Sequence, residues 1–112
     1  MSITLSQMIQ SLYGVKSTHK KSNTGYTVGA TAVEMLKNNP NRVSFIVVNL
    51  SGNSLYMSTS PDVSSANGIY ISPNGGRMIL QWDVDFELVS QQWYGIATGA
   101  GSAVFILENI SI

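Results

Sequence analysis

The sequence predicts an all-β protein, an antiparallel β-sandwich of about eight strands that follows a short N-terminal amphipathic helix and a flexible linker. Two observations favour this fold class. After Gly25, short runs rich in β-branched and aromatic residues alternate with clusters of Gly, Pro, Asn, Asp and Ser. Before Gly25, an apolar stripe with helical spacing is followed by a polar stretch. We therefore expect an anchor helix at 1–14, a linker at 15–25 and one β-sandwich domain at 26–112, because 112 residues suffice for one core.

The predicted anchor helix carries its apolar side chains on one face. Spacings of three and four residues relate Leu5, Met8, Ile9, Leu12 and Tyr13. Thr4 and Gln7 have the spacing of a capping box, and Gly14 is typical of a left-handed helix end. A helix this short is marginally stable in water, so its stripe needs a surface to dock on. That surface is the body of the same chain, a second copy, or a separate partner to which these five residues anchor the protein.

The predicted linker has the composition of an exposed tether. Residues 15–25 consist of Lys, Ser, Thr, His, Asn and Gly with a single apolar residue. Stretched out, such a segment would span roughly 35 Å. We expect it to separate the anchor helix from the β-sandwich.

The strands are predicted from runs of β-forming residues between turn signals. These runs are 26–28, 32–36, 43–49, 54–58, 68–71, 77–82, 85–89, 93–97 and 103–110. Asn74-Gly75 between two runs predicts a type I′ hairpin turn.

The spacing of apolar residues within the runs predicts the core. Trp82, Val84, Phe86 and Leu88 alternate with acidic residues, so we expect these four to be buried and the acidic ones to face water. Residues 45–48 and 104–107 are continuously apolar, which predicts burial on both sides of those strands. Burial is also expected for Tyr56, Ile69 and Ile71.

Charged residues are few and unevenly distributed. They make up 11% of the chain, against about 25% in typical soluble domains, and we expect so uncharged a surface to be covered by other protein. The net charge is zero, but it is unevenly divided. Residues 1–42 have five basic residues and one acidic residue, a net charge of +4, and residues 43–112 have one basic and five acidic residues, a net charge of −4.

The basic residues between Lys16 and Lys21 are too few for a nucleic-acid surface, and no apolar run suits a signal peptide or a membrane span. We expect neither nucleic acid nor a membrane as a partner.

Residue types that carry catalysis are scarce. His19 is the only histidine and lies in the predicted linker, so histidine-based acid–base catalysis and multi-histidine metal sites lack their components. On the predicted strand, Asp83, Asp85 and Glu87 would project from one face about 7 Å apart. A hard cation is one interpretation of this row, and a solvated or subunit-facing surface is the other. We expect a protein that is not an enzyme, with no catalytic, cofactor-binding or metal-binding residue.

The aromatic residues suggest a second functional hypothesis. Exposed rings stack on the flat faces of sugars, and Tyr70, Trp93 and Tyr94 are the candidates for glycan stacking. In a sandwich of this size most aromatic side chains are instead needed in the core or at an interface. Both interpretations stay open from the sequence.

Several motifs occur in an order that resembles small tailed-phage and related viral structural proteins. Asn39-Pro40-Asn41-Arg42 leads into an apolar strand that ends at Asn49. The motifs that follow are Ser54-Leu55-Tyr56-Met57-Ser58, Asp62-Val63-Ser64 and Gly68-Ile69-Tyr70-Ile71. Tyr94-Gly95-Ile96-Ala97 then precedes a closing run that ends at Glu108. The resemblance extends over residues 31–108. It implies a jelly-roll-like β-sandwich of the virion, such as a capsid decoration, cement or fibre-base protein or a minor capsid component.

The resemblance also implies partners and a location. The partners would be the major capsid protein or another virion protein, and the chain would form a homo-oligomer, with a trimer favoured. The protein would be made in the host cytoplasm and displayed on the capsid surface. The alternative function is a carbohydrate-binding module for host attachment, whose ligand would be a host glycan.

Overall fold

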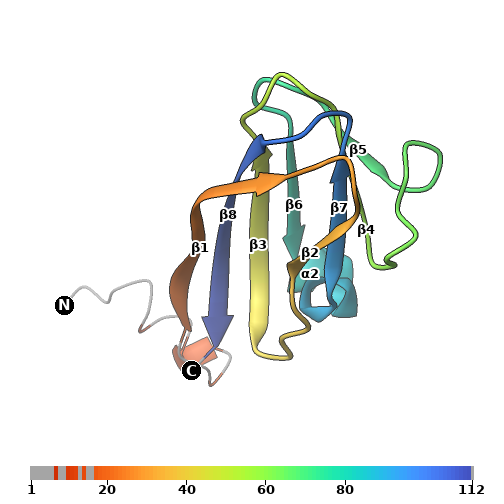
Figure 1. The fold of residues 1–112 in the computed structure, drawn as a ribbon. Coiled ribbons are helices and arrows are strands. Elements are labelled where there is room, and N and C mark those ends of the chain that lie inside the picture. The colour runs from red at the N-terminus through yellow and green to blue at the C-terminus, as the bar shows by residue number, and fades with distance from the viewer. Residues whose placement is uncertain (1–6, 8–9, 13, 15–16, 112) are drawn as a thin grey trace.

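The computed structural model describes residues 7, 10–12, 14 and 17–111, with the backbone alone described for 17–26. Within these residues, eight strands form two antiparallel sheets of four strands each (Figure 1). One sheet has the order β1-β8-β3-β6, and its strands are β1 (Ser17–Val28), β3 (Arg42–Asn49), β6 (Arg77–Gln81) and β8 (Ser102–Ser111). The other has the order β2-β7-β4-β5, and its strands are β2 (Val33–Leu36), β4 (Leu55–Ser58), β5 (Ile69–Ile71) and β7 (Trp93–Ala97). The predicted all-β fold with two packed antiparallel sheets is confirmed.

The strands pair as a nested series. β1 pairs with β8, β2 with β7, β3 with β6 and β4 with β5, each pair antiparallel. Successive pairs of this series lie alternately in the two sheets, and the β3–β8 and β4–β7 ladders join them within each sheet. The chain is therefore arranged as one long hairpin that is folded across both sheets.

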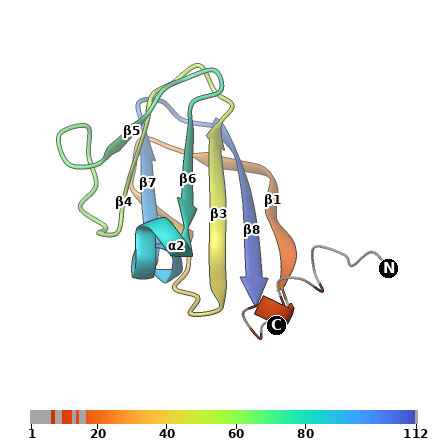
Figure 2. The same cartoon turned by 180° about the vertical axis from the view of Figure 1, so that it is seen from behind.

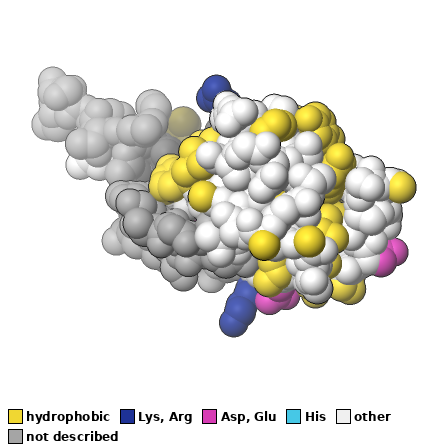
Figure 3. Space-filling view, turned by 45° about the horizontal axis from the view of Figure 1, so that its top comes forward, with side chains coloured by type: hydrophobic (Ala, Val, Ile, Leu, Met, Phe, Trp, Pro, Cys, Tyr) yellow, Lys and Arg dark blue, Asp and Glu magenta, His cyan; other side chains and the backbone are white. Residues whose placement is uncertain are grey.

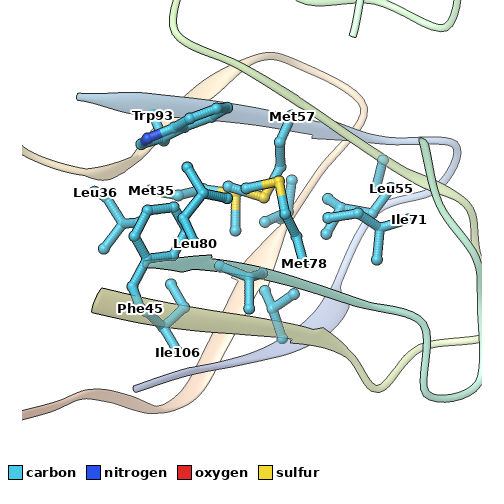
Figure 4. Packing of buried hydrophobic residues seen from close by; sticks show 14 of the residues in the cluster. Met35, Leu36, Phe45, Leu55, Met57, Ile71, Met78, Leu80, Trp93 and Ile106 are labelled. Carbon is cyan, nitrogen blue, oxygen red and sulfur yellow. The ribbon is translucent and has the colours of Figure 1, made fainter. Parts of the chain in front are cut away.

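Alternating side chains from both sheets fill the space between them. Phe45, Val47, Val104 and Ile106 face inward from the first sheet, and Leu55, Met57, Trp93 and Ala97 face inward from the second. Figure 4 shows the labelled side chains meeting between the two layers. The rings of Phe45 and Trp93 touch edge to face, with centroids 5.9 Å apart. The core thus follows from the period-two alternation of buried residues along the strands.

Most of the predicted strands are observed. From β2 onward, every predicted run except 85–89 coincides with a strand to within one residue at each end. The burial predicted for Ile71 is confirmed, whereas Tyr56 is half-buried and Ile69 is exposed. Residues 45–48 and 104–107 were expected to be buried on both faces of their strands. Their inward-facing side chains are buried, whereas Ile46, Val48 and Leu107 on the outer face are only half-buried.

The strand predicted at 85–89 is wrong. Residues Trp82–Asp85 form a helical turn, α2, and Phe86–Ser90 form a 3-10 turn, η1, which together connect β6 to β7 at one end of the sandwich (Figure 2). A strand continuing from β6 would stay in the first sheet, whereas β7 belongs to the second, so the chain has to turn here. The Asp85 carboxylate accepts a hydrogen bond of 2.9 Å from the backbone N–H of Gln81, which stabilises that turn.

The first strand is longer than predicted. β1 begins at Ser17, and its backbone pairs with β8 from Ser17 opposite Ser111 to Val28 opposite Ser102. This stretch of the expected linker is therefore part of a sheet rather than a tether. β1 is an edge strand, and polar, lysine-rich sequences with bulges are common at sheet edges because they discourage pairing with other chains.

The predicted anchor helix lies mostly outside the described residues. Leu5, Met8, Ile9 and Tyr13 are not among them. The described residues Gln7 and 10–12 have helical backbone, Gly14 has φ 70°, and the Gly14 N–H donates to the Gln10 carbonyl at 2.8 Å. Leu12 is exposed.

The Asn74-Gly75 turn has the backbone that the sequence predicts, but it is not a hairpin. Both residues have positive φ, 60° and 107°. The flanking strands β5 and β6 lie in different sheets and do not pair. The turn therefore passes the chain from one sheet to the other.

Candidate functional site

The largest departure from an ordinary protein surface lies in the connection between β6 and β7. Four large apolar side chains there are exposed, Trp82 by 49%, Val84 by 67%, Phe86 by 74% and Leu88 by 49%. We refer to these four residues as the 82–88 patch. Three carboxylates, those of Asp83, Asp85 and Glu87, alternate with them along the chain. Several large apolar side chains exposed along one short connection, with charged residues between them, are typical of a protein-binding surface.

Phe86 occupies a backbone conformation that suits glycine. Its φ is 55° and its ψ is −128°, close to the first central position of a type II′ turn, where the Cβ of any L-residue is crowded. A bulky residue at positive φ is a strained arrangement. The ring gains little from the fold in return, since it is the most exposed large apolar side chain among the described residues.

An open recess adjoins the patch. It has a volume of about 550 Å³ and is lined by Thr59, Asp85, Phe86, Glu87, Leu88 and Gln91. Apolar and acidic side chains thus line the same hollow. Its chemistry suits an occupant that brings both apolar and basic groups.

A buried arginine holds the base of this segment to the sandwich. The Arg42 Nη1 donates to the carbonyls of Val89 and Gln91, each at 3.2 Å, and Nη2 donates to the Lys37 carbonyl at 2.7 Å. Its Nε lies 2.6 Å from Oε1 of Glu108, with both side chains buried. Arg42 therefore ties β3, β8, η1 and the end of β2 together. With all of its nitrogens engaged in this way, the arginine is a structural clamp rather than a ligand-binding group.

Trp93 also supports the patch from below. Its indole N–H donates to the Leu88 carbonyl at 3.0 Å, while its ring packs in the core against Phe45. This places Leu88 directly over the core. The patch is consequently carried on a part of the chain that the core holds in place.

The three aromatic residues proposed for glycan stacking are not brought together. Trp93 is 3% exposed, so its ring has no free face, and this candidate is withdrawn. Tyr70 is 56% exposed on β5, beside Tyr56 on β4 with ring centroids 5.5 Å apart. Tyr94 is half-buried on β7, which is separated from β5 by β4. Tyr70 and Tyr56 are the pair that the outer face of the second sheet presents.

The described residues hold no arrangement that indicates catalysis. The predicted row of Asp83, Asp85 and Glu87 is on helical turns rather than on one strand face, and no cluster of three or more metal-ligating side chains occurs in this part of the chain. Every buried side-chain nitrogen or oxygen there has a hydrogen-bond partner. The side chain of His19 lies outside the description. Among the same residues, no helix has the length and apolar character needed to cross a membrane.

Charged side chains are also sparse on the surface. In the view of Figure 3, Lys, Arg, Asp and Glu side chains appear at only a few places on the visible described surface, and hydrophobic side chains appear at many. Comparisons of the chain with models of protein families, with curated proteins and with solved structures found no match.

Two features of the site escaped sequence reasoning. The alternation of apolar and acidic residues from Trp82 to Leu88 has the period of a strand, so these apolar residues were expected in the core rather than on the surface. The Arg42–Glu108 pair had a visible signal, since each is the single charged residue of a mainly apolar strand sequence. A charged residue in that position is almost never buried without a partner of opposite sign.

Proposed function

We propose that this chain is a non-enzymatic virion structural protein with a jelly-roll fold, a capsid decoration or cement protein or a minor capsid component displayed on the particle surface. The observation that carries the proposal is the nested pairing of β1 with β8, β2 with β7, β3 with β6 and β4 with β5. This nested pairing of eight strands across two sheets supports the proposed jelly-roll fold. That architecture is shared by viral capsid proteins, lectins and cupins.

The interior of the sandwich favours a structural role within that group. Large side chains fill the space between the sheets, and Phe45, Leu55, Met57, Ile71 and Ile106 are essentially inaccessible to solvent. A sandwich filled in this way does not enclose a small-molecule ligand between its sheets. Binding therefore has to use the outside of the molecule.

The outside of the molecule favours protein partners. The 82–88 patch is apolar and exposed, and the outer face of the first sheet carries Ile46, Val48 and Leu107 half-buried. A surface with so few charges suits contacts that are repeated many times in a lattice, where weak sites gain from multivalency. In this proposal residues 1–14 contribute to attachment or to oligomerisation.

The proposal is tested on virus particles. Antibodies against the recombinant protein are applied to particles purified from the biological source of the sequence, with electron microscopy and mass spectrometry as readouts. We expect labelling of the particle surface and peptides of this chain in the particle fraction. A chain found only in the soluble fraction of particle-producing cells would refute the proposal.

A truncation tests the attachment step. The variant should lack residues 1–14 only, because β1 begins at Ser17 and supplies an edge of the first sheet. We expect the shortened protein to keep its β-sheet circular dichroism but to stop sedimenting with particles. Sedimentation equal to that of the full chain would show that residues 1–14 do not attach it.

Carbohydrate binding for host attachment is the second candidate. It is favoured by one observation, the exposed Tyr70 ring beside Tyr56 on the outer face of the second sheet. A glycan array with the Tyr70→Ala variant tests it, and Ile69→Ala serves as a control because Ile69 is a neighbouring exposed residue without a ring. A hit lost in the tyrosine variant alone would support this function, and an array without hits would remove it.

A further inference from the structure

We infer that the 82–88 patch is the docking surface for the N-terminal segment of a second copy of this chain, residues 1–16, which precede β1. The resulting contact is head to tail, since one copy supplies the segment and the other supplies the patch. The inference rests on the proposed function, because it names the contact through which the virion protein would form its oligomer.

The acceptor surface combines apolar and acidic groups. Val84 and Phe86 are 67% and 74% exposed, and Leu88 lies beside Phe86 in the wall of the open recess. Asp85 and Glu87 line the same recess. No basic residue follows Arg77 in the sequence. Arg42, which donates to the Val89 and Gln91 carbonyls beneath this segment, has its charge balanced by Glu108.

The backbone conformation of Phe86 indicates that exposure of its ring serves a function. Its backbone is in a region that glycine tolerates and bulky residues avoid, yet the ring is left in solvent. The fold would be served better by glycine at this position. Strain of this kind persists mainly at functional sites, among them active sites, ligand clamps and switch regions.

The N-terminal segment has the complementary chemistry. Its predicted apolar stripe, Leu5, Met8, Ile9, Leu12 and Tyr13, is followed within eight residues by Lys16, His19, Lys20 and Lys21. Residues 1–21 contain three lysines and no aspartate or glutamate, whereas the acceptor region is acidic. An amphipathic helix that lays its apolar side on such a surface, with basic groups reaching the carboxylates, matches both features.

The geometry favours a second copy over the chain's own segment. β1 and β6 are the two opposite edges of the first sheet. Both views of the fold show the described residues of the N-terminal segment beside the lower ends of β1 and β8, whereas α2 lies next to β6 and β7 (Figures 1 and 2). Leu12, the one member of the apolar stripe that the structure describes, is 68% exposed there.

A head-to-tail contact has a consequence for the assembly. Because the two surfaces differ, repetition of the contact leads either to a closed ring or to an open filament. A ring of three copies agrees with the proposed virion protein, and its mass would be three times the 12.1 kDa of the chain.

The decisive experiment mixes two variants of the full chain in light scattering coupled to size exclusion. Phe86→Gly removes the ring from the acceptor, and Met8→Gln with Ile9→Gln removes the apolar stripe from the donor. We expect the wild type to form an oligomer and each variant to be monomeric, with self-association weakened at least about tenfold. The mixture should form a one-to-one dimer, because each variant retains the surface that the other has lost. A monomeric wild type, or a mixture that stays monomeric, would overturn the inference.

Matched controls identify the surfaces. Leu50→Ser changes another exposed leucine, which follows β3 at the opposite end of the sandwich, and Ser11→Gln adds an amide away from the predicted stripe. Both should associate like the wild type. Loss of association in either control would show that the contact is not confined to the proposed surfaces.

A charge exchange tests the electrostatic part. Asp83→Lys with Glu87→Lys, and separately Lys16→Glu with Lys21→Glu, should each weaken association, and their combination in one chain should restore it. Failure of the combined variant to recover would exclude the N-terminal segment as the occupant.

The strain at Phe86 provides a readout that does not depend on association. In the background of the donor variant, where no oligomer is expected, Phe86→Gly should raise the thermal midpoint by about 4 °C. A clear fall would show that the ring packs in its own fold and would overturn the inference. These experiments use the isolated protein. A negative result in them would therefore leave the proposed virion function standing, because particle labelling tests that function separately. Likewise, an absence of particle labelling would leave the inferred contact between copies standing.

Discussion

Replacement of Arg42 should be the most damaging single change outside the apolar core. Arg42→Met keeps an unbranched side chain of similar length but removes the cation that lies 2.6 Å from Glu108. It also leaves the carbonyls of Lys37, Val89 and Gln91 without their guanidinium donors. Breaking a buried ion pair costs about 3–5 kcal/mol, and a buried carbonyl left without a donor adds about 1 kcal/mol or more.

We therefore expect Arg42→Met to lower the free energy of unfolding by about 5 kcal/mol, a large part of the stability of a typical domain. Glu108→Gln should cost less, about 3 kcal/mol: it leaves the buried guanidinium without its counter-charge, but its amide oxygen still accepts from Nε and the three carbonyls still hold the guanidinium. Arg42→Lys should fall between the two, since an ammonium group cannot reach all four acceptors at once.

Urea denaturation followed by tryptophan fluorescence measures these differences, because Trp93 lies in the core and bonds to Leu88 within the same region. Glu108→Gln and Arg42→Lys keep the test valid if Arg42→Met does not fold. A loss below about 1 kcal/mol for Arg42→Met and Arg42→Lys alike, or equal losses for Glu108→Gln and Arg42→Met, would refute the clamp.

Two further predictions concern the opposite end of the sandwich. Asn49→Ala should lower the free energy of unfolding in urea by about 3 kcal/mol, because the buried amide donates to the carbonyls of Asn53 and Ile71 and accepts from Ser51. Asn49→Asp should cost at least as much, since its carboxylate would face those two carbonyls. A smaller loss of stability for Asn49→Asp than for Asn49→Ala would contradict this. Gly76→Ala should cost about 2–3 kcal/mol, because its Cβ would overlap the backbone of Ser72. Gly52→Ala is the control, with open space around its Cβ, and equal midpoints for the two alanine variants would show that the overlap is relieved.

The sequence predicts the body of this fold because its strands have strong local signals. Runs such as 93–97 and 43–49 are bounded by turn residues, and their inward positions follow the period of two that a half-buried strand imposes. Asn74 and Gly75 likewise predict their own backbone, since few residues tolerate positive φ. Each of these features depends on residues that are neighbours in the chain.

The candidate site was harder to predict for the same reason. The alternation from Trp82 to Leu88 fits a strand as well as it fits the observed turns, and only the transfer of the chain from β6 in one sheet to β7 in the other decides between them. The exposure of Phe86 and the acidic recess follow from that decision. Glycan stacking by Trp93 failed similarly, because the alternation on β7 places it in the core.

By itself, the sequence determined the all-β class, the position of nearly every strand, and the separation of a basic N-terminal segment from an acidic body. The tertiary structure alone decided which strands pair, that Arg42 and Glu108 meet across 66 positions of the chain, and that four apolar residues expected in the core lie on the surface. The physical reason is that strand formation depends on local backbone and side-chain preferences. Pairing, burial and the clamp depend instead on contacts between distant segments, and these arise only when both sheets close around one core.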